Sequence, residues 1–566
     1  MSGVVGLAMA SVFPDIDKDI FNWSLVLLWL ILWRVLRKCG IDKYKRIRLI
    51  DLWWTVPLWI VLLSRFPIYY PVYDDFAFHL EVGGYAKNLW QATNFLPLDY
   101  GSYVYPVAQL IYPFLLNILG FRLSLLVNGI LLIGWYISIN LRLKHVEKNK
   151  NKKIAWDLIF LYVFFVPHLM ATHTTFMVDF LTLVLGVEMF YQLATNKGNR
   201  TLGVIVGLLS MIIKQSAGIV LMPLFLYLVW QKKKDIKWIW VFLFLIPIFI
   251  FFGASYINTG NPISFLYNGF FKSPLYSLTS FKDARWGPQN WWEVLLWPIV
   301  GQFTLRYGEG LVNDNAKYFF ASFWAVPYLW SWWMLLVKRK WKYAIFVFSY
   351  LLWSVLMGYS RYLLTFVAVY WLYLINELKV KYDFKFKKYW WWLLIFVGLC
   401  FNSVSTDFGW RPDLQWLKSS ADRPYFIKHY VDGWRLIGKD RLEDIENSYK
   451  SILDKKRTVI IAYRGQESFL AYLASVNGAS VVQAVDTAKY NELTNSNQIS
   501  DDFKSLLKKV DEESEILVIG NTQWLNLKSI YWTKNRNCDQ VKINPAAWYF
   551  QSPTLYADTV LYLCIK

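Results

Sequence analysis

Residues 202–230 read LGVIVGLLSMIIKQSAGIVLMPLFLYLVW, an apolar run that Lys214 divides near its middle. A lysine halfway along a single lipid-crossing helix is costly, and the run has a basic segment on either side. We therefore predict two half-length helices, 202–213 and 215–230, in place of one kinked helix. This choice decides the fold, because a single helix would invert the orientation of every later segment.

Similar apolar runs recur along the 566-residue chain, which is 56% hydrophobic and 19% aromatic. This composition exceeds what a soluble core needs and indicates a polytopic membrane protein. The formal net charge of +20 is gathered in short connections between the runs, which argues against nucleic-acid binding. Short basic connections are typical of the cytoplasmic side of a membrane. There are six of them, at 34–48, 142–153, 197–200, 232–237, 338–342 and 379–388.

The apolar runs between these connections predict an α-helical membrane domain over residues 1–403, with about 12 transmembrane helices. This number places both the N-terminus and everything after residue 403 outside. We interpret the apolar stretch 103–119 as an interfacial helix, because a further crossing would move the 142–153 segment outside. No basic region precedes the first apolar run, so no cleaved signal peptide is predicted. The predicted spans are 22–37, 52–66, 121–143, 154–170, 172–193, 202–213, 215–230, 238–257, 318–337, 341–357, 361–378 and 389–403.

The composition changes after residue 403, and residues 404–566 predict a small extracytoplasmic α/β domain. The stretches TVIIAY, ASVVQAV and EILVIG, which begin at Thr458, Ala479 and Glu515, are typical of buried strands. Helical patterns at 467–476 and 501–510 alternate with them. Cys538 and Cys564 both fall in this domain, where either a disulfide or two free buried thiols would fit.

Two long outer loops, 67–120 and 258–317, are predicted on the same side as this domain. The first begins with the acidic pair Asp74-Asp75, just beyond an apolar span. Paired carboxylates are costly where lipid begins, so this pair indicates a functional site.

Four stretches, taken together and in order, resemble the GT-C membrane glycosyltransferases, such as the protein O-mannosyltransferases and the aminoarabinose transferases that modify lipid A. In that family an acidic pair, usually Asp-Glu, starts a helix of the first outer loop; this chain has Asp-Asp. The resemblance covers roughly residues 50–380. The stretches are DDFAFHLEVGGYAKNLWQATNFLP (74–97), THTTFMVDFLTLVLG (172–186), GLLSMIIKQSAGIVLMPLF (207–225) and SRYLLTFVAVYWLYL (360–374).

The resemblance implies a sugar donor carried on a polyprenyl phosphate and an acceptor lipid, glycan or protein, in a bacterial cell membrane with the active site outside. Such a transfer needs a base for the acceptor hydroxyl and positive charge for the departing phosphate. Asp74 or Asp75 is the candidate base, and Asp75 is a candidate ligand for a divalent metal, Mg²⁺ or Mn²⁺. The alternative is that both residues only cap a helix. His79 shares a helix face with Asp75 and is a candidate support.

Charged residues near the outer ends of the later spans are further candidates. Asp179 lies near the outer end of an apolar helix, with His173 as a nearby candidate partner, in either a functional or a purely structural pair. Lys214 and Arg361 are the candidate phosphate ligands at membrane depth, with snorkelling to the surface as the alternative for each. Arg285 and Arg306, in the second outer loop, are weaker candidates for phosphate or sugar contacts.

The sequence argues against two other functions. A transporter of lipid-linked sugars should show inverted repeats and polar residues at mid-membrane, and neither is found in the sequence. A polysaccharide polymerase or ligase would be expected to use a late loop rich in Arg and His, whereas this chain has its acidic pair early and only five histidines.

Overall fold

The computed structural model describes two parts of the chain. The first is residues 178–378, apart from 196–197, 264–266, 277, 279–286, 302–313 and 357. The second consists of 457–462, 479–521, 525–541 and 559–566. Residues 95–96 and a few single positions are also described. The predicted spans 22–37, 52–66, 121–143, 154–170 and 389–403, and the interfacial helix 103–119, lie wholly or mostly outside these residues.

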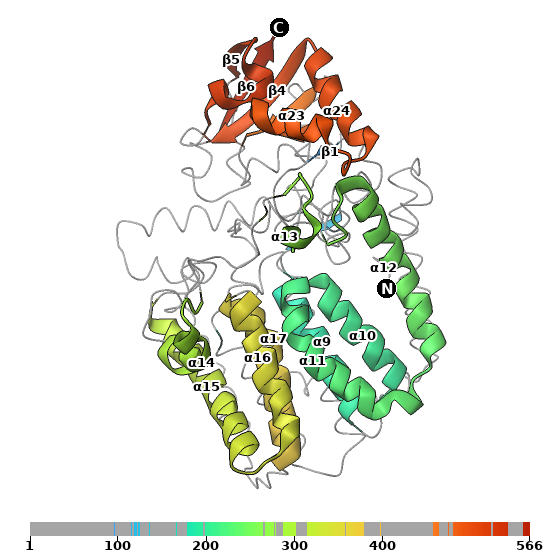
Figure 1. Cartoon of the computed structure of the whole chain (residues 1–566), viewed down its shortest axis with the longest axis vertical. Coiled ribbons are helices and arrows are strands. Elements are labelled where there is room, and N and C mark those ends of the chain that lie inside the picture. The colour runs from blue at the N-terminus through green and yellow to red at the C-terminus, as the bar shows by residue number, and fades with distance from the viewer. Residues whose placement is uncertain are drawn as a thin grey trace.

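The first part consists of apolar helices that lie roughly side by side (Figure 1). Every span predicted between residues 172 and 378 is found as a helix, to within a few residues at its described ends. The long helices are α9 (Asp179–Ala194), α10 (Arg200–Ile213), α11 (Gln215–Lys232), α12 (Trp238–Thr259), α15 (Asp314–Leu336), α16 (Ala344–Leu356) and α17 (Leu364–Leu378).

The division at Lys214 is confirmed. α10 ends at Ile213, α11 begins at Gln215, and Lys214 between them has a non-helical backbone with φ −136° and ψ 87°. The two helices are antiparallel and touch closely, since a Cβ on Gly218 would lie only 2.7 Å from the carbonyl oxygen of Met211. At the other end, the start of α10 contacts the residue before α12 (Trp238–Thr259), where the Lys237 N–H donates to Thr201 Oγ1 at 2.8 Å. The run is therefore a tight helical hairpin.

This hairpin brings the described basic connections to one end of the helices. Residues 198–200, 232–237 and 338–342 all lie at the end of the molecule away from the C-terminal domain (Figure 1). Lys342 at this end is paired with Glu377 near the end of α17. The arrangement fits the predicted cytoplasmic side for these three connections.

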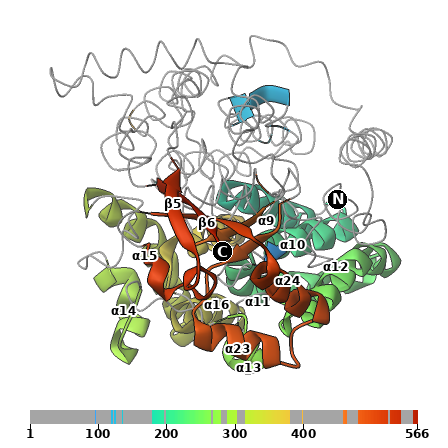
Figure 2. The ribbon, with the colours of Figure 1, turned by 90° about the horizontal axis from the view of Figure 1, so that it is seen from above.

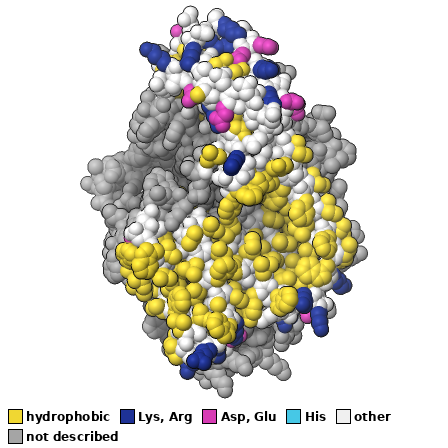
Figure 3. Space-filling view, viewed as in Figure 1, with side chains coloured by type: hydrophobic (Ala, Val, Ile, Leu, Met, Phe, Trp, Pro, Cys, Tyr) yellow, Lys and Arg dark blue, Asp and Glu magenta, His cyan; other side chains and the backbone are white. Residues whose placement is uncertain are grey.

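Between the two ends the surface is largely apolar (Figure 3). Trp230, Phe249 and Ile257 are 70%, 65% and 71% exposed, and many other large apolar side chains on α11, α12, α14 and α15 are similarly open. Of the described helices, α12 is the one long and apolar enough to cross a membrane, with 22 residues and a mean hydropathy of 2.3. A continuous apolar surface of this extent is expected to face lipid.

Aromatic side chains fill the centre of α15, α16 and α17. Phe346 stacks on Tyr370 with ring centroids 3.7 Å apart, and Trp324 lies edge-on to Tyr350 at 4.7 Å. The Tyr370 hydroxyl donates to the carbonyl of Pro327 at 3.0 Å, and the same carbonyl accepts a hydrogen bond from the Ser331 hydroxyl at 2.8 Å.

A short apolar helix, α14 (Trp291–Val300), also packs against this aromatic core. Tyr328 Oη donates to the Leu295 carbonyl at 2.7 Å, and Trp297 is fully buried. This segment belongs to the predicted second outer loop, and its helix was not predicted from the sequence.

The second part is the α/β domain predicted from the sequence. Its mixed sheet has the order β1-β3-β2-β4-β6-β5. Strands β1, β3, β2 and β4 are parallel to one another, and β6 is antiparallel to both of its neighbours, β4 and β5. α24 (Asp501–Glu512) is the predicted helix 501–510, whereas α23 (Thr487–Asn495) was not predicted. The strands are β1 (Phe95–Leu96), β2 (Thr458–Ile461), β3 (Val481–Gln483), β4 (Glu515–Asn521), β5 (Asn537–Val541) and β6 (Thr559–Ile565).

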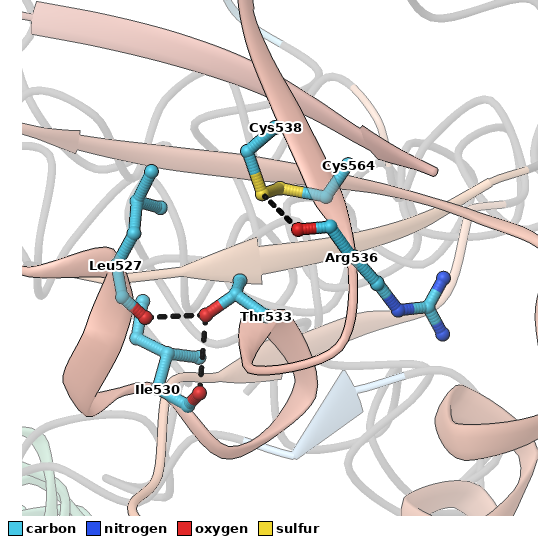
Figure 4. The surroundings of a disulfide bond; sticks show 6 residues. All are labelled: Leu527, Ile530, Thr533, Arg536, Cys538 and Cys564. Atoms are coloured by element: carbon cyan, nitrogen blue, oxygen red, sulfur yellow. Dashed lines mark hydrogen bonds between the residues drawn. A yellow bond between two sulfur atoms is a disulfide. The ribbon is translucent and has the colours of Figure 1, made fainter. Parts of the chain in front are cut away.

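Cys538 and Cys564 form a disulfide, which settles the alternative left open by the sequence (Figure 4). The two residues face each other in neighbouring strands β5 and β6, and Cys564 is fully buried. Disulfides persist in oxidising compartments, so the bond supports an extracytoplasmic location for this domain.

Both predicted outer loops reach this domain. β1, from the first outer loop, is the edge strand beside β3, and Leu275 and Tyr276, from the second, lie in the domain's core. At the end of α12, the Asn258 carbonyl accepts a hydrogen bond from the Ser500 N–H at 3.2 Å. Seen from above, the domain lies over the ends of the helices (Figure 2). The outer loops, the domain and one end of the helices therefore share one side.

This arrangement makes a prediction about topology that cysteine labelling can check. Membrane-impermeant maleimide should label Asn290→Cys and Asp502→Cys in intact cells, because both positions are exposed and belong to segments predicted to lie outside. Lys234→Cys and Lys340→Cys, exposed at the basic end, should react only after permeabilisation. Labelling of Lys234→Cys in intact cells would contradict the hairpin orientation.

Candidate active site

Three of the charged residues predicted as site residues meet at the ends of the helices nearest the C-terminal domain. Asp179 is the first residue of α9, Lys214 forms the turn between α10 and α11, and Arg361 lies in the short helix η8 (Ser360–Leu363) before α17. The helices α9, α10, α11 and α17 each have their other end at the basic end of the molecule. The fold therefore brings together residues up to about 180 positions apart in the sequence.

Lys214 Nζ and Asp179 Oδ1 form an ion pair. It is well shielded, since the side chain of Asp179 is 3% exposed and that of Lys214 is 12% exposed. Two buried charges repay their desolvation only when they face each other with good geometry. Asp179 also stands in the first turn of α9, where the helix dipole favours a negative charge.

The partner of Asp179 differs from the predicted one, His173, which lies six positions away in the sequence. His173 is outside the described residues. The sequence did indicate the pair of Asp179 and Lys214. The two residues have opposite charges, and each lies in an apolar segment, near the end that is predicted to face outside.

Tyr362 connects the two cations. Its ring centroid lies 4.7 Å from Lys214 Nζ and 5.4 Å from the Arg361 guanidinium carbon, and the ring is 6% exposed. The Arg361 guanidinium is also 5.7 Å from the ring of Tyr359. Cations at these distances are attracted by the ring quadrupole, the more strongly when water is excluded. Tyr359 and Tyr362 were not predicted as site residues, although the Arg-Tyr helix containing Tyr362 was.

The turn that carries Arg361 is held in place by backbone contacts. Gly358 has a left-handed φ of +80°, and the Trp353 indole N–H donates to the Tyr359 carbonyl at 2.6 Å. Gly287, from the second outer loop, lies against this turn with φ +70°. A Cβ on Gly287 would be 2.5 Å from the Gly358 Cα. The outer loop can therefore approach the Arg361 turn this closely only because residue 287 is a glycine, and the left-handed φ of Gly358 also favours glycine.

Close packing beneath the charges fixes the helices that carry them. Ser210 Oγ in α10 donates to the Thr182 carbonyl in α9 at 3.0 Å. A Cβ on Gly186 in α9 would lie 2.3 Å from Thr365 Cγ2 in α17. Asp179, Lys214 and Arg361 thus stand on elements that can shift little relative to one another.

The remaining predicted site residues lie outside the described part of the chain: Asp74, Asp75, His79, Arg285 and Arg306. Their roles stay predictions. The described residues contain no group of three or more His, Cys, Asp or Glu that could hold a metal ion. The divalent metal predicted at Asp75 concerns a residue beyond them and also stays a prediction.

Comparisons with known proteins give one finding. No family model and no curated protein matches the chain. The structure is similar to the crystal structure of ArnT from Cupriavidus metallidurans bound to undecaprenyl phosphate, with 10% sequence identity and a TM-score of 0.44. The match covers 90% of this chain and 97% of that chain, and it falls in the group that the sequence resembles. At this identity and TM-score, the residues and their contacts must carry any assignment of function.

The contact between the two glycines predicts a specific loss of stability. In Gly287→Ala the new Cβ must displace the Arg361 turn, and the left-handed backbone is itself unfavourable for alanine, so a cost of about 1–3 kcal/mol is expected. Thermal unfolding of the purified protein should show a lowered Tm.

Gly253→Ala is the matched control, because a Cβ there meets nothing within 4 Å in the interior of α12. Its Tm should be unchanged or slightly higher, as alanine is the better helix former by about 0.5–1 kcal/mol. Equal Tm values for the two variants would contradict the close fit at Gly287.

Proposed function

We propose that the chain is an integral membrane glycosyltransferase that moves a sugar from a polyprenyl-phosphate donor to an acceptor on the extracytoplasmic side. The observation that carries this proposal is the meeting of Lys214 and Arg361 around Tyr362. These cations stand at the outer ends of apolar helices and beneath a disulfide-bonded domain. A lipid phosphate needs positive charge at this depth.

The length of α10 supports a position for Lys214 below the outer membrane surface. Fourteen helical residues span about 21 Å, and the hydrocarbon core is about 30 Å thick. With the basic end of α10 at the inner surface, Lys214 lies within the outer part of the core. A cation there must have an anionic partner, either the carboxylate of Asp179 or a phosphate brought by a lipid.

The two cations are suited to different parts of phosphate binding. Lys214 is a compact point charge on a flexible stem, which can reorient from Asp179 towards a second anion. Arg361 offers a planar fork of donors that fits two phosphate oxygens at once. We propose that both contact the donor phosphate, with Arg285 and Arg306 as additional contacts.

The proposed chemistry of the acidic pair Asp74-Asp75 is predicted from the sequence. Asp74 or Asp75 would take the proton from the acceptor hydroxyl as its oxygen bonds to the sugar carbon. The bond from that carbon to the phosphate oxygen breaks, and the polyprenyl phosphate leaves with the electron pair, stabilised by Lys214 and Arg361. His79, Asp179 and His173 are proposed to support this step by orienting charged groups. A divalent cation held by Asp75 would help to neutralise the phosphate.

The position of the described charges favours transfer over transport. A transporter is expected to hold its substrate near mid-membrane, on broken helices in paired positions. Here the helix break at Lys214 and the turn at Arg361 are both at the outer ends. The acceptor, whether lipid, glycan or protein, would approach from outside, which a polysaccharide polymerase or ligase would also require. The proposed location is a bacterial cell membrane.

Donor binding tests the roles of the two cations. Arg361→Met and the double variant Asp179→Asn/Lys214→Met remove positive charge but keep chain length, and the double variant leaves no buried carboxylate unpaired. Each should weaken binding of a polyprenyl phosphate at least about 10-fold, the effect of 1.4 kcal/mol. Isothermal titration in detergent measures the Kd.

Lys342→Met is the matched control for these variants. Lys342 is also paired with a carboxylate, that of Glu377, and lies 5.7 Å from the ring of Tyr343, but at the inner end. Its Kd for the polyprenyl phosphate should equal that of the wild type. Unchanged affinity in both outer variants would leave Lys214 and Arg361 as structural residues.

Transfer activity tests the acidic pair. Asp→Asn keeps the shape and the capping ability of the side chain but removes its basicity, so loss of the base should lower turnover by roughly 10²-fold or more. Purified Asp74→Asn and Asp75→Asn can be assayed with a radiolabelled sugar on a polyprenyl phosphate, with Tm as the control for folding. Wild-type turnover in both variants would show that the pair only caps a helix.

A further inference from the structure

We propose that the one-turn helix α13 (Asn268–Phe271) and the residues beside it form an anchor that inserts into the outer lipid leaflet, at the boundary between headgroups and acyl chains. This inference rests on the proposed membrane location but not on the proposed reaction. The anchor consists of Phe270, Lys272 and Leu278.

The segment from α13 to Leu278 has an exposed face and a buried face. Phe270 is 81% exposed and Leu278 is 66% exposed, and Lys272 between them is also exposed. The residues from Ser273 to Tyr276 are buried, and Leu275 and Tyr276 pack in the core of the C-terminal domain. The segment therefore presents two apolar side chains and a cation outward from a firmly held base.

The base is a buried polar network centred on Asn268, which is fully buried. Its amide donates to the carbonyls of Ser273 and Tyr276, both at 2.9 Å. Its carbonyl oxygen accepts from the Ser273 N–H at 2.8 Å and from the Asn261 amide at 3.3 Å. A buried amide that uses both its donors and its acceptor defines one conformation of the surrounding backbone.

This network holds a backbone that is unfavourable on its own. Tyr267 and Lys272, on either side of α13, both have left-handed φ angles, of 56° and 57°. Residues with a Cβ rarely adopt this region unless surrounding contacts impose it. The exposed Phe270 is thus displayed by a rigid turn and is not the tip of a loose loop.

The position of α13 along the molecule points to lipid as the partner. On α12 the exposed apolar side chains continue to Tyr256 and Ile257, 55% and 71% exposed, and the helix then ends in the polar network at Thr259. In the space-filling view, the apolar surface gives way to charged side chains at the base of the C-terminal domain (Figure 3). Aromatic residues and lysines are enriched at this level of a membrane protein.

The size of the exposed patch also favours lipid over a protein partner. A stable protein interface buries about 800 Å² on each side. Two apolar side chains beside a lysine provide far less than this, but they match the apolar and cationic pattern of an interfacial lipid contact.

Quenching by brominated lipids tests the anchor. A bimane label on Phe270→Cys, in the full chain with Cys39 and Cys400 replaced by serine, is placed in vesicles whose lipids carry bromine at either shallow or deep acyl positions. Shallow bromines should quench this label several-fold more than they quench a label on Lys508→Cys, which is exposed on α24.

A label on Phe249→Cys, in the middle of the exposed face of α12, separates this inference from the membrane location itself. Deep bromines should quench the label at 249 most, and shallow bromines the label at 270. Quenching at 249 with none at 270 would overturn the anchor and leave the membrane location standing. No quenching at either position would overturn both.

Discussion

The ion pair between Lys214 and Asp179 is the interaction on which the described helices depend. At about 21 Å, α10 is too short to cross the full hydrocarbon core, and an unpaired lysine at its last turn would be costly in lipid surroundings. Pairing with Asp179 stabilises that charge and joins the turn to the start of α9. The chain then reverses into α11, which sets the direction of α12 and of every helix after it. The same turn brings Lys214 against Tyr362 and so towards Arg361.

The outer side is organised by contacts between segments far apart in the sequence. β1 from the first outer loop extends the C-terminal sheet, and the end of α12 joins the same domain through Asn258 and Ser500. Gly287 of the second outer loop lies on the Arg361 turn. The domain and both loops are therefore connected to the helix ends where the cations meet. This arrangement gives the C-terminal domain a structural role: it fixes the outer loops above the charged cluster.

Local patterns predicted much of this fold and marked the charged residues of the site, but they did not decide which distant residues pair. The break at Lys214 was predictable because a charge in an apolar run and basic segments on both sides are local signals. α14 was missed because ten apolar residues are too few to predict a span. The partner of Asp179 was missed because Lys214 is 35 positions away and only the folded chain brings them together. Tyr362 was missed for a similar reason, since a tyrosine near a helix end is ordinarily an interfacial anchor.

The central claim is that the cluster of Lys214, Arg361 and Tyr362 binds a lipid phosphate at the outer face of the membrane. A structure of the protein in lipid nanodiscs with a bound polyprenyl phosphate tests it most directly. The account predicts phosphate oxygens within about 3.2 Å of both Lys214 Nζ and the Arg361 guanidinium, with the prenyl chain along the apolar surface of the helices. A phosphate bound away from both cations, with Lys214 still facing only Asp179, would contradict it.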